Sequence, residues 1–184
     1  MTSTADIRLR ALEPEDLELM YRIENDARFW RHGTTTVPYS RYALREYLAN
    51  SHNDIFADGQ VRLVIERVAT TEVATTEGST EITPIGFADL VNFDAIHLRA
   101  EIGLLILPEY QGQHCGRATL QHLCDYARQL HLHQIYAIIA TTNEPAMQLF
   151  AHSAFKASTP LHDWLRTDEG FADAVVWQLC LSAA

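Results

Sequence analysis

The residues best placed to do chemistry form the loop Gln111–Gly116, Q-G-Q-H-C-G, which has one glycine in second position and another in last. An apolar run, Ile102–Leu107, precedes this loop, and residues at helical spacing follow it. A helix that begins directly after a glycine-bearing loop presents free backbone N–H groups and the positive end of its dipole. Such a helix start binds phosphate, so the spacing predicts a site for a pyrophosphate-bearing cofactor.

Two elements must position this loop. The run Ile102–Leu107 predicts a strand that is buried on both faces, and Pro108 ends it because proline cannot donate to a ladder. A helix is expected from Gly116 to Leu130, since apolar residues recur there on one face. These residues are Leu120, Leu123, Cys124, Ala127 and Leu130.

The run Pro108–Gly112, P-E-Y-Q-G, and the helix after it resemble the acetyl-CoA loop of the GNAT acyltransferases. The Gln-x-x-Gly-x-Gly/Ala pattern of that family falls on Gln111, Gly112, Gln113, His114, Cys115 and Gly116. The resemblance implies that backbone N–H groups of this loop bind the pyrophosphate. His114 replaces the middle glycine. At a negative φ it would add only bulk, whereas at a positive φ it would be strained.

The same resemblance implies further contacts to the cofactor. The peptide groups of Ile106 and Leu107 pair with the pantetheine amides, and a main-chain N–H there polarises the thioester carbonyl. Arg117, at the start of the helix, either helps to hold phosphate or is simply solvated. Direct transfer needs no covalent intermediate, so Cys115 is expected to pack or line the loop rather than to act as a nucleophile.

A second segment, Thr142–Phe155, is similar to the GNAT stretch Asn-Glu-x-Ala-x-x-Leu-Tyr…Gly-Phe. This resemblance implies that the Asn143 side chain touches the pantetheine or orders a water, and that Phe150 lies beside the cofactor. Many relatives have a tyrosine at that position, which protonates the departing CoA thiolate, and Phe150 has no proton to give. The remaining proton sources are Tyr110, His114, His152 and bulk water.

Glu101 begins the strand before the loop and is the candidate general base. Relatives often carry a glutamate at this site, which draws a proton from the amine through water. The alternative is a carboxylate at the edge of a strand that faces solvent or pairs with Arg99.

In this family, helical segments between the first two strands roof the acceptor site. The resemblance therefore makes four aromatic residues candidates for substrate contact, with packing under the roof as the alternative for each. They are Phe29, Trp30, Tyr39 and Tyr42.

Composition narrows the class of protein. The chain has 184 residues, 47% hydrophobic and 21% charged, which suits a single domain with a proper core. A formal net charge of -10 argues against nucleic acid as a partner and mildly favours a cationic small substrate. Three cysteines without a C-x-x-C, no membrane-length apolar run and no leader-like start predict free thiols in the cytoplasm. Two pairs could suggest a metal, namely His131 with His133 and His122 with Cys124. Neither pair has a third convergent ligand at zinc spacing, so no metal is expected.

The pattern of elements predicts an α/β (α+β) fold with a mixed sheet. The resemblance implies a GNAT fold, in which a mixed, mostly antiparallel twisted sheet of about seven strands is flanked by helices. Strands are expected at 7–12, 61–68, 85–91, 102–107, 134–140 and 174–181, with strand and turn at 164–171. Helices are expected from Pro14, from Ser40 as N-cap, from Gly116, and from 143 to 155, with 25–38 irregular. The polar segment 69–77 is expected to connect two strands.

These observations predict an N-acetyltransferase that moves an acetyl group directly from acetyl-CoA to a primary amine. The acceptor is a polyamine, another small amine or a protein N-terminus, and homo-oligomers are compatible with this reading. The alternative is a catalytically weakened CoA-binding module with a regulatory or structural role, which the changes at His114 and Phe150 favour.

Overall fold

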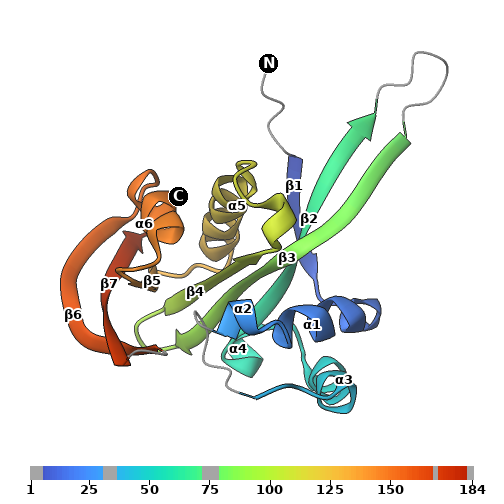
Figure 1. Cartoon of the computed structure of the whole chain (residues 1–184), viewed down its shortest axis with the longest axis horizontal. Helices are drawn as coiled ribbons and strands as arrows, with labels where there is room; N and C mark the ends of the chain where they lie inside the picture. Colours follow the sequence, from blue (N-terminus) through green and yellow to red (C-terminus); the bar gives the residue numbers. More distant parts are fainter. Residues whose placement is uncertain (1–5, 31–36, 72–78, 168–169, 182–184) are drawn as a thin grey trace.

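The computed structural model describes residues 6–30, 37–71, 79–167 and 170–181 (Figure 1). The strands are β1 (Asp6–Ala11), β2 (Val61–Thr71), β3 (Ser79–Asp94), β4 (Arg99–Ile106), β5 (Gln134–Ala140), β6 (Lys156–Thr167) and β7 (Gly170–Cys180). The helices are α1 (Leu17–Glu24), α2 (Ala27–Trp30), α3 (Arg41–Asn50), α4 (Ile55–Asp58), α5 (Cys115–Gln129) and α6 (Glu144–Ala151). Two 3-10 turns, η1 (Pro14–Asp16) and η2 (Pro108–Tyr110), precede α1 and α5.

The described strands form a seven-stranded sheet in the order β1-β2-β3-β4-β5-β7-β6. Each neighbouring pair is antiparallel except β4 and β5, which are parallel. This confirms the predicted mixed, mostly antiparallel GNAT sheet with flanking helices.

The parallel pairing of β4 with β5 is short. It runs through three residue pairs, from Arg99 opposite Gln134 to Glu101 opposite Tyr136. Beyond this point β4 stays paired with β3 as far as Ile106, while β5 stays paired with β7. The sheet therefore splits between β4 and β5, and the second half of β4 has a free edge on the β5 side (Figure 1).

Hydrophobic clusters cover the two faces of the sheet. On one face, α5 contributes Leu120, Leu123 and Ala127 to a core that includes Ile65 of β2 and Ile102 of β4. On the other face, helices α1 and α3 pack against Val64, Phe87 and Leu107 with buried residues of their own. These are Met20, Ile23 and Leu44. Successive strand residues point to opposite faces, so one apolar run in β2 serves both clusters.

Several boundaries differ from those predicted. Strand β3 continues to Asp94, although the predicted strand ended at residue 91, and the range 25–38, expected to be irregular, includes the short helix α2. Helix α6 ends at Ala151 rather than at Phe155. The Ser153 N–H and hydroxyl both donate to the Phe150 carbonyl, at 3.1 and 2.6 Å, in a tighter turn that follows the helix. Strand β6 then begins at Lys156, earlier than expected.

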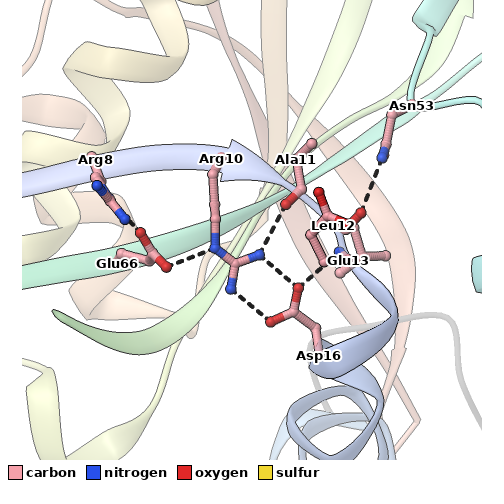
Figure 2. A network of polar contacts seen from close by, with 8 residues as sticks. All are labelled: Arg8, Arg10, Ala11, Leu12, Glu13, Asp16, Asn53 and Glu66. Carbon is pink, nitrogen blue, oxygen red and sulfur yellow. Dashed lines mark hydrogen bonds and ion pairs between the residues drawn. The ribbon is translucent and has the colours of Figure 1, made fainter.

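An arginine network anchors the first strand (Figure 2). The Arg10 guanidinium donates to both Asp16 oxygens at 2.6 and 2.7 Å and to Glu66 at 2.6 Å, and Arg8 also donates to Glu66. Asp16 and Glu66 are only 4% and 5% exposed. The Asp16 carboxylate also accepts the Glu13 backbone N–H at 2.9 Å. The Arg10 side chain of β1 thus binds the Glu66 carboxylate of β2 and the Asp16 carboxylate of η1.

Replacing Arg10 with methionine would leave two buried carboxylates without their shared guanidinium. We expect the free energy of unfolding to fall by about 3–5 kcal/mol, because an uncompensated buried charge is strongly destabilising. Urea unfolding followed by circular dichroism measures this. Arg22→Met, at an exposed position of α1, is the control and should stay within about 0.5 kcal/mol of wild type.

The same network makes stability depend on pH. Burial raises the pKa values of Asp16 and Glu66, but the bonds and charge of Arg10 outweigh it, so both lie below their usual range. Carboxyl groups with lower pKa values in the folded state stabilise it above their unfolded pKa values of roughly 4. That contribution is lost as pH falls through the folded values. The difference between wild type and Arg10→Met should therefore shrink below about pH 4, and a constant difference would contradict this.

Candidate active site

The loop between β4 and α5 is held by its own side chains. The Gln111 amide donates to the Ile106 carbonyl at 2.8 Å, and the Gln113 amide donates to the Glu109 carbonyl at 2.8 Å. Gly112 has a φ of 72°, a left-handed conformation that glycine adopts without strain. Both glutamine side chains thus fix the path of the loop, and its backbone is left to face a ligand.

The start of α5 has no side-chain cap. His114 is the N-cap residue, but its side chain makes no capping hydrogen bond. The Ala118 N–H donates to the His114 carbonyl at 3.2 Å. In the part of the chain that the structure describes, the N–H groups of Cys115, Gly116 and Arg117 have no acceptor. They present three donors and the positive end of a 15-residue helix at the end of β4.

Two conformations were considered for His114, one with a negative φ and one with a positive φ, and the structure has the strained, positive one. Its φ is 63° and its ψ is 2°, which is the left-handed region. A side chain with a Cβ is disfavoured there, by roughly 1–2 kcal/mol. The imidazole is exposed, so His114 introduces backbone strain but its side chain does not block the loop.

The free edge of β4 offers fewer donors than predicted. The Leu107 N–H donates to the Ile85 carbonyl of the β3 segment at 2.8 Å, so this donor is already engaged, and the binding of pantetheine at Leu107 stays a prediction. Peptide groups in an antiparallel pair alternate in direction. Ile106 therefore directs its N–H away from β3, toward the side on which β5 has diverged, and its carbonyl accepts from Gln111.

Glu101 lies on the face of the sheet opposite α5, at the last residue pair before the split. It is half-buried and accepts a hydrogen bond from the Asn92 amide at 2.8 Å. Arg99 donates to Asp94 at 3.1 Å, so the alternative in which Glu101 pairs with Arg99 is not found among the described residues. Asn92 has a φ of 51° beside an irregular register of β3 with β4, and this local geometry provides the partner of Glu101.

Tyr136 is a neighbour of Glu101 that the sequence did not single out. It is the parallel partner of Glu101 in β5 and is half-buried. Burial and the nearby Glu101 carboxylate raise the pKa of its phenol, which therefore keeps its proton at neutral pH. The sequence did contain a signal for Tyr136. Side chains alternate between the two faces of a strand, so Tyr136 lies on the face opposite to that of the core-facing Ile135 and Ala137.

A buried ion network lies on the same face as Glu101. Arg62 donates to both Asp89 oxygens at 3.0 and 2.8 Å and to Glu24 at 2.5 Å. Burial raises the pKa of Asp89, which the Arg62 charge opposes. Asp89 lies opposite Gly103, two residues along β4 from Glu101. Residues from α1, β2 and β3 thus place two carboxylates and one guanidinium near the split, which sequence spacing did not indicate.

Other predicted site residues have structural partners. Phe150 is 3% exposed and packs against Phe155 at 4.9 Å and Trp177 at 6.3 Å between ring centroids. The Asn143 side chain caps α6 by accepting the Ala146 N–H at 3.3 Å. Burial raises the pKa of the Cys115 thiol, which fits packing rather than nucleophilic attack.

Three of the four predicted acceptor aromatics have described side chains, and these differ in exposure and contacts. Phe29 packs against the cluster under α1 and α3. Tyr39 is 40% exposed and Tyr42 is 67% exposed, with the Tyr42 hydroxyl donating to Glu46 at 2.7 Å. The side chain of Trp30 lies outside the described residues. Among the described residues, no group of three or more His, Cys, Asp or Glu is arranged to hold a metal.

The conformation of His114 predicts that glycine at this position stabilises the fold. His114→Gly should raise the free energy of unfolding by about 1 kcal/mol, because glycine adopts a positive φ without strain. Thermal unfolding measures the change. Gln113→Gly is the control at a neighbouring position without a positive φ, and it should lower stability instead. Equal effects of the two substitutions would count against strain at His114.

Comparison with known proteins confirms the resemblance. Residues 6–156 match the family described as Acetyltransferase (GNAT) domain. The spermidine N(1)-acetyltransferase of Vibrio cholerae is 28% identical over 152 residues, covering 82% of this chain and 79% of that protein. The Escherichia coli K12 enzyme of the same name is 28% identical over 162 residues, covering 88% and 78%. The crystal structure of Vibrio cholerae spermidine N-acetyltransferase in complex with CoA and spermine has a TM-score of 0.75 at 26% identity, covering 96% of each chain. This chain belongs to the GNAT acetyltransferase family.

Proposed function

We propose that this N-acetyltransferase transfers the acetyl group of acetyl-CoA directly to a primary amine of a polyamine. The observation that carries the proposal is the split between β4 and β5, which lies between the uncapped start of α5 on one face and Glu101 on the other. The relatives named as spermidine acetyltransferases support the acceptor class. The net charge of -10 favours a cationic substrate as well.

The loop and the free edge of β4 fit the cosubstrate. In our proposal, the N–H groups of Cys115, Gly116 and Arg117 bind the diphosphate, and the outward N–H of Ile106 binds the pantetheine. Acetyl-CoA supplies the activated thioester. A Cβ at Gly116 would meet its nearest neighbour, Leu149, at 3.5 Å, an ordinary contact, so the start of the helix would also accommodate a small side chain such as alanine.

On the opposite face, Glu101 is proposed to take the proton of the attacking ammonium, directly or through water. The neutral nitrogen then bonds to the carbonyl carbon and gives up a second proton to water as the amide forms. The carbon–sulfur bond breaks, and the thiolate takes a proton from water. Phe150 supplies no proton, and its ring is buried in the core.

Further properties follow as proposals. The described strands form one sheet with a core on each face, which supports a single acyltransferase domain. A dodecameric structure of the Vibrio cholerae relative supports a homo-oligomer. The three cysteines are free thiols, which suits a cytoplasmic location. Within the described residues, we find no helix whose length and apolar content would let it cross a bilayer.

A thiol-release assay tests the function. With acetyl-CoA present, spermidine and spermine should release CoA faster than neutral or acidic amine compounds of similar size. The same panel should include a peptide with a free N-terminus, because transfer to protein amines is the rival acceptor class. If the protein binds CoA in calorimetry but acetylates none of these amines, it is a CoA-binding module and the proposal fails.

Glu101→Gln tests the base. Turnover should fall by about 10²–10⁴-fold, because a positioned general base contributes that much, while the Kd for CoA should stay within about twofold. Asp125→Asn, which removes a carboxylate from the exposed side of α5, is the matched control and should leave turnover unchanged. Unchanged turnover of Glu101→Gln across the pH range would remove the residue from the mechanism.

A further inference from the structure

Arg67 of β2 lies on the face of the sheet that α5 covers. It is the cross-strand partner of Ile7 in β1 and of Thr83 in β3. Directly paired residues of adjacent strands direct their side chains to the same face. Ile7 is 3% exposed and belongs to the core that packs under α5, so Arg67 shares that face.

The charge of Arg67 reaches the start of α5. Burial raises the pKa of the Cys115 thiol, and the Arg67 guanidinium opposes that rise. The strand register also places Arg67 close to the start of α5. Ile106 at the end of β4 pairs with Gly86 of β3, which pairs with Ile65 of β2, two residues before Arg67. A Cβ on Gly116 of α5 would lie 3.8 Å from the Ile106 side chain, so Arg67 lies near the uncapped N–H groups described above. Arg67 is half-buried, as expected for a side chain whose apolar stem covers the core while its head reaches the surface.

Arg67 differs from the other half-buried arginines of this sheet. Arg10 and Arg62 each bind two carboxylates. Among the described residues, Arg67 forms no ion pair or hydrogen bond through its side chain, although the chain has 24 acidic residues against 14 basic ones. Its neighbour Glu66 points to the opposite face, where it binds Arg8 and Arg10.

A guanidinium that is partly removed from water loses hydration, so an anionic partner would stabilise it. The uncapped amides of α5 also call for an anion, and Arg117, exposed in the first turn, adds a second charge without an ion pair in the described part of the chain. Arg67 of β2 and Arg117 of α5 thus both lie near the uncapped start of α5.

We propose that Arg67 is a phosphate-binding residue for CoA, acting together with the start of α5. A guanidinium binds phosphate oxygens through parallel N–H donors, which suits a partner of fixed geometry. This inference rests on the proposed function, since it assigns one more residue to the cosubstrate. CoA offers two sources of the same chemistry, the diphosphate and the 3′-phosphate of the ribose.

Calorimetry with CoA and with 3′-dephospho-CoA tests the inference on the full chain. Arg67→Met keeps the apolar stem and removes the charge. We expect its Kd for CoA to rise about 10-fold or more, as for the loss of a charge-assisted hydrogen bond. An equal loss with both ligands assigns Arg67 to the diphosphate, and a loss with CoA alone assigns it to the 3′-phosphate. Arg22→Met removes the same charge from α1 and should leave both values unchanged.

A Kd of folded Arg67→Met within about twofold of wild type would overturn the inference while leaving CoA binding intact. Absence of CoA binding to the wild-type chain would instead reject the proposed function. A measurement without any substitution guards against a variant that does not fold. Phenylglyoxal should modify Arg67 of the wild-type protein several-fold more slowly when CoA is present, as followed by mass spectrometry. No protection of Arg67 would equally contradict the proposal.

Discussion

The pairing of β4 with β5 through only three residues is the constraint on which the rest of the structure depends. Each of these strands has a second, antiparallel partner that continues much further, β3 for one and β7 for the other. The sheet can therefore divide without either arm losing its ladder. The division leaves a strand edge with free peptide groups inside the molecule rather than at the end of the sheet, and in our proposal the cosubstrate binds these groups.

Buried polar networks stabilise the arm that carries the helix start. Arg10 ties β1 to β2 and η1, and Arg62 ties β2 to β3 and α1. Both networks lie on the α1 and α3 face, so the α5 face can be almost wholly apolar beneath the helix. Such networks are costly unless each member is satisfied, and here each guanidinium meets two carboxylates. They fix the relative positions of elements that hydrophobic contact alone would leave free to slide.

The local elements were the part that the sequence could predict. Strand β5 spans 134–140 as expected, and Ser40 caps α3 by accepting the Ala43 N–H at 3.1 Å. The loop before α5 was predicted from its glycines and from the helical spacing after it. The left-handed φ of His114 was one of two alternatives, because residue types alone do not determine which positions of a loop are left-handed. The partner of Glu101 depends on an irregular β3–β4 register, and contacts of that kind join residues that spacing does not relate.

Charge is divided between the two faces of the sheet, and this division fits a reaction between a polyanion and a polycation. On the α5 side, Arg67 and Arg117 lie near a helix start whose dipole is positive. On the other side lie Glu101 and the Glu24 and Asp89 carboxylates that bind Arg62. A net charge of -10 spread evenly would repel the phosphates of CoA as strongly as it attracts an ammonium. In our proposal, placing these acids on the face opposite α5 removes that conflict, because the phosphates approach the helix start and the ammonium approaches the carboxylates.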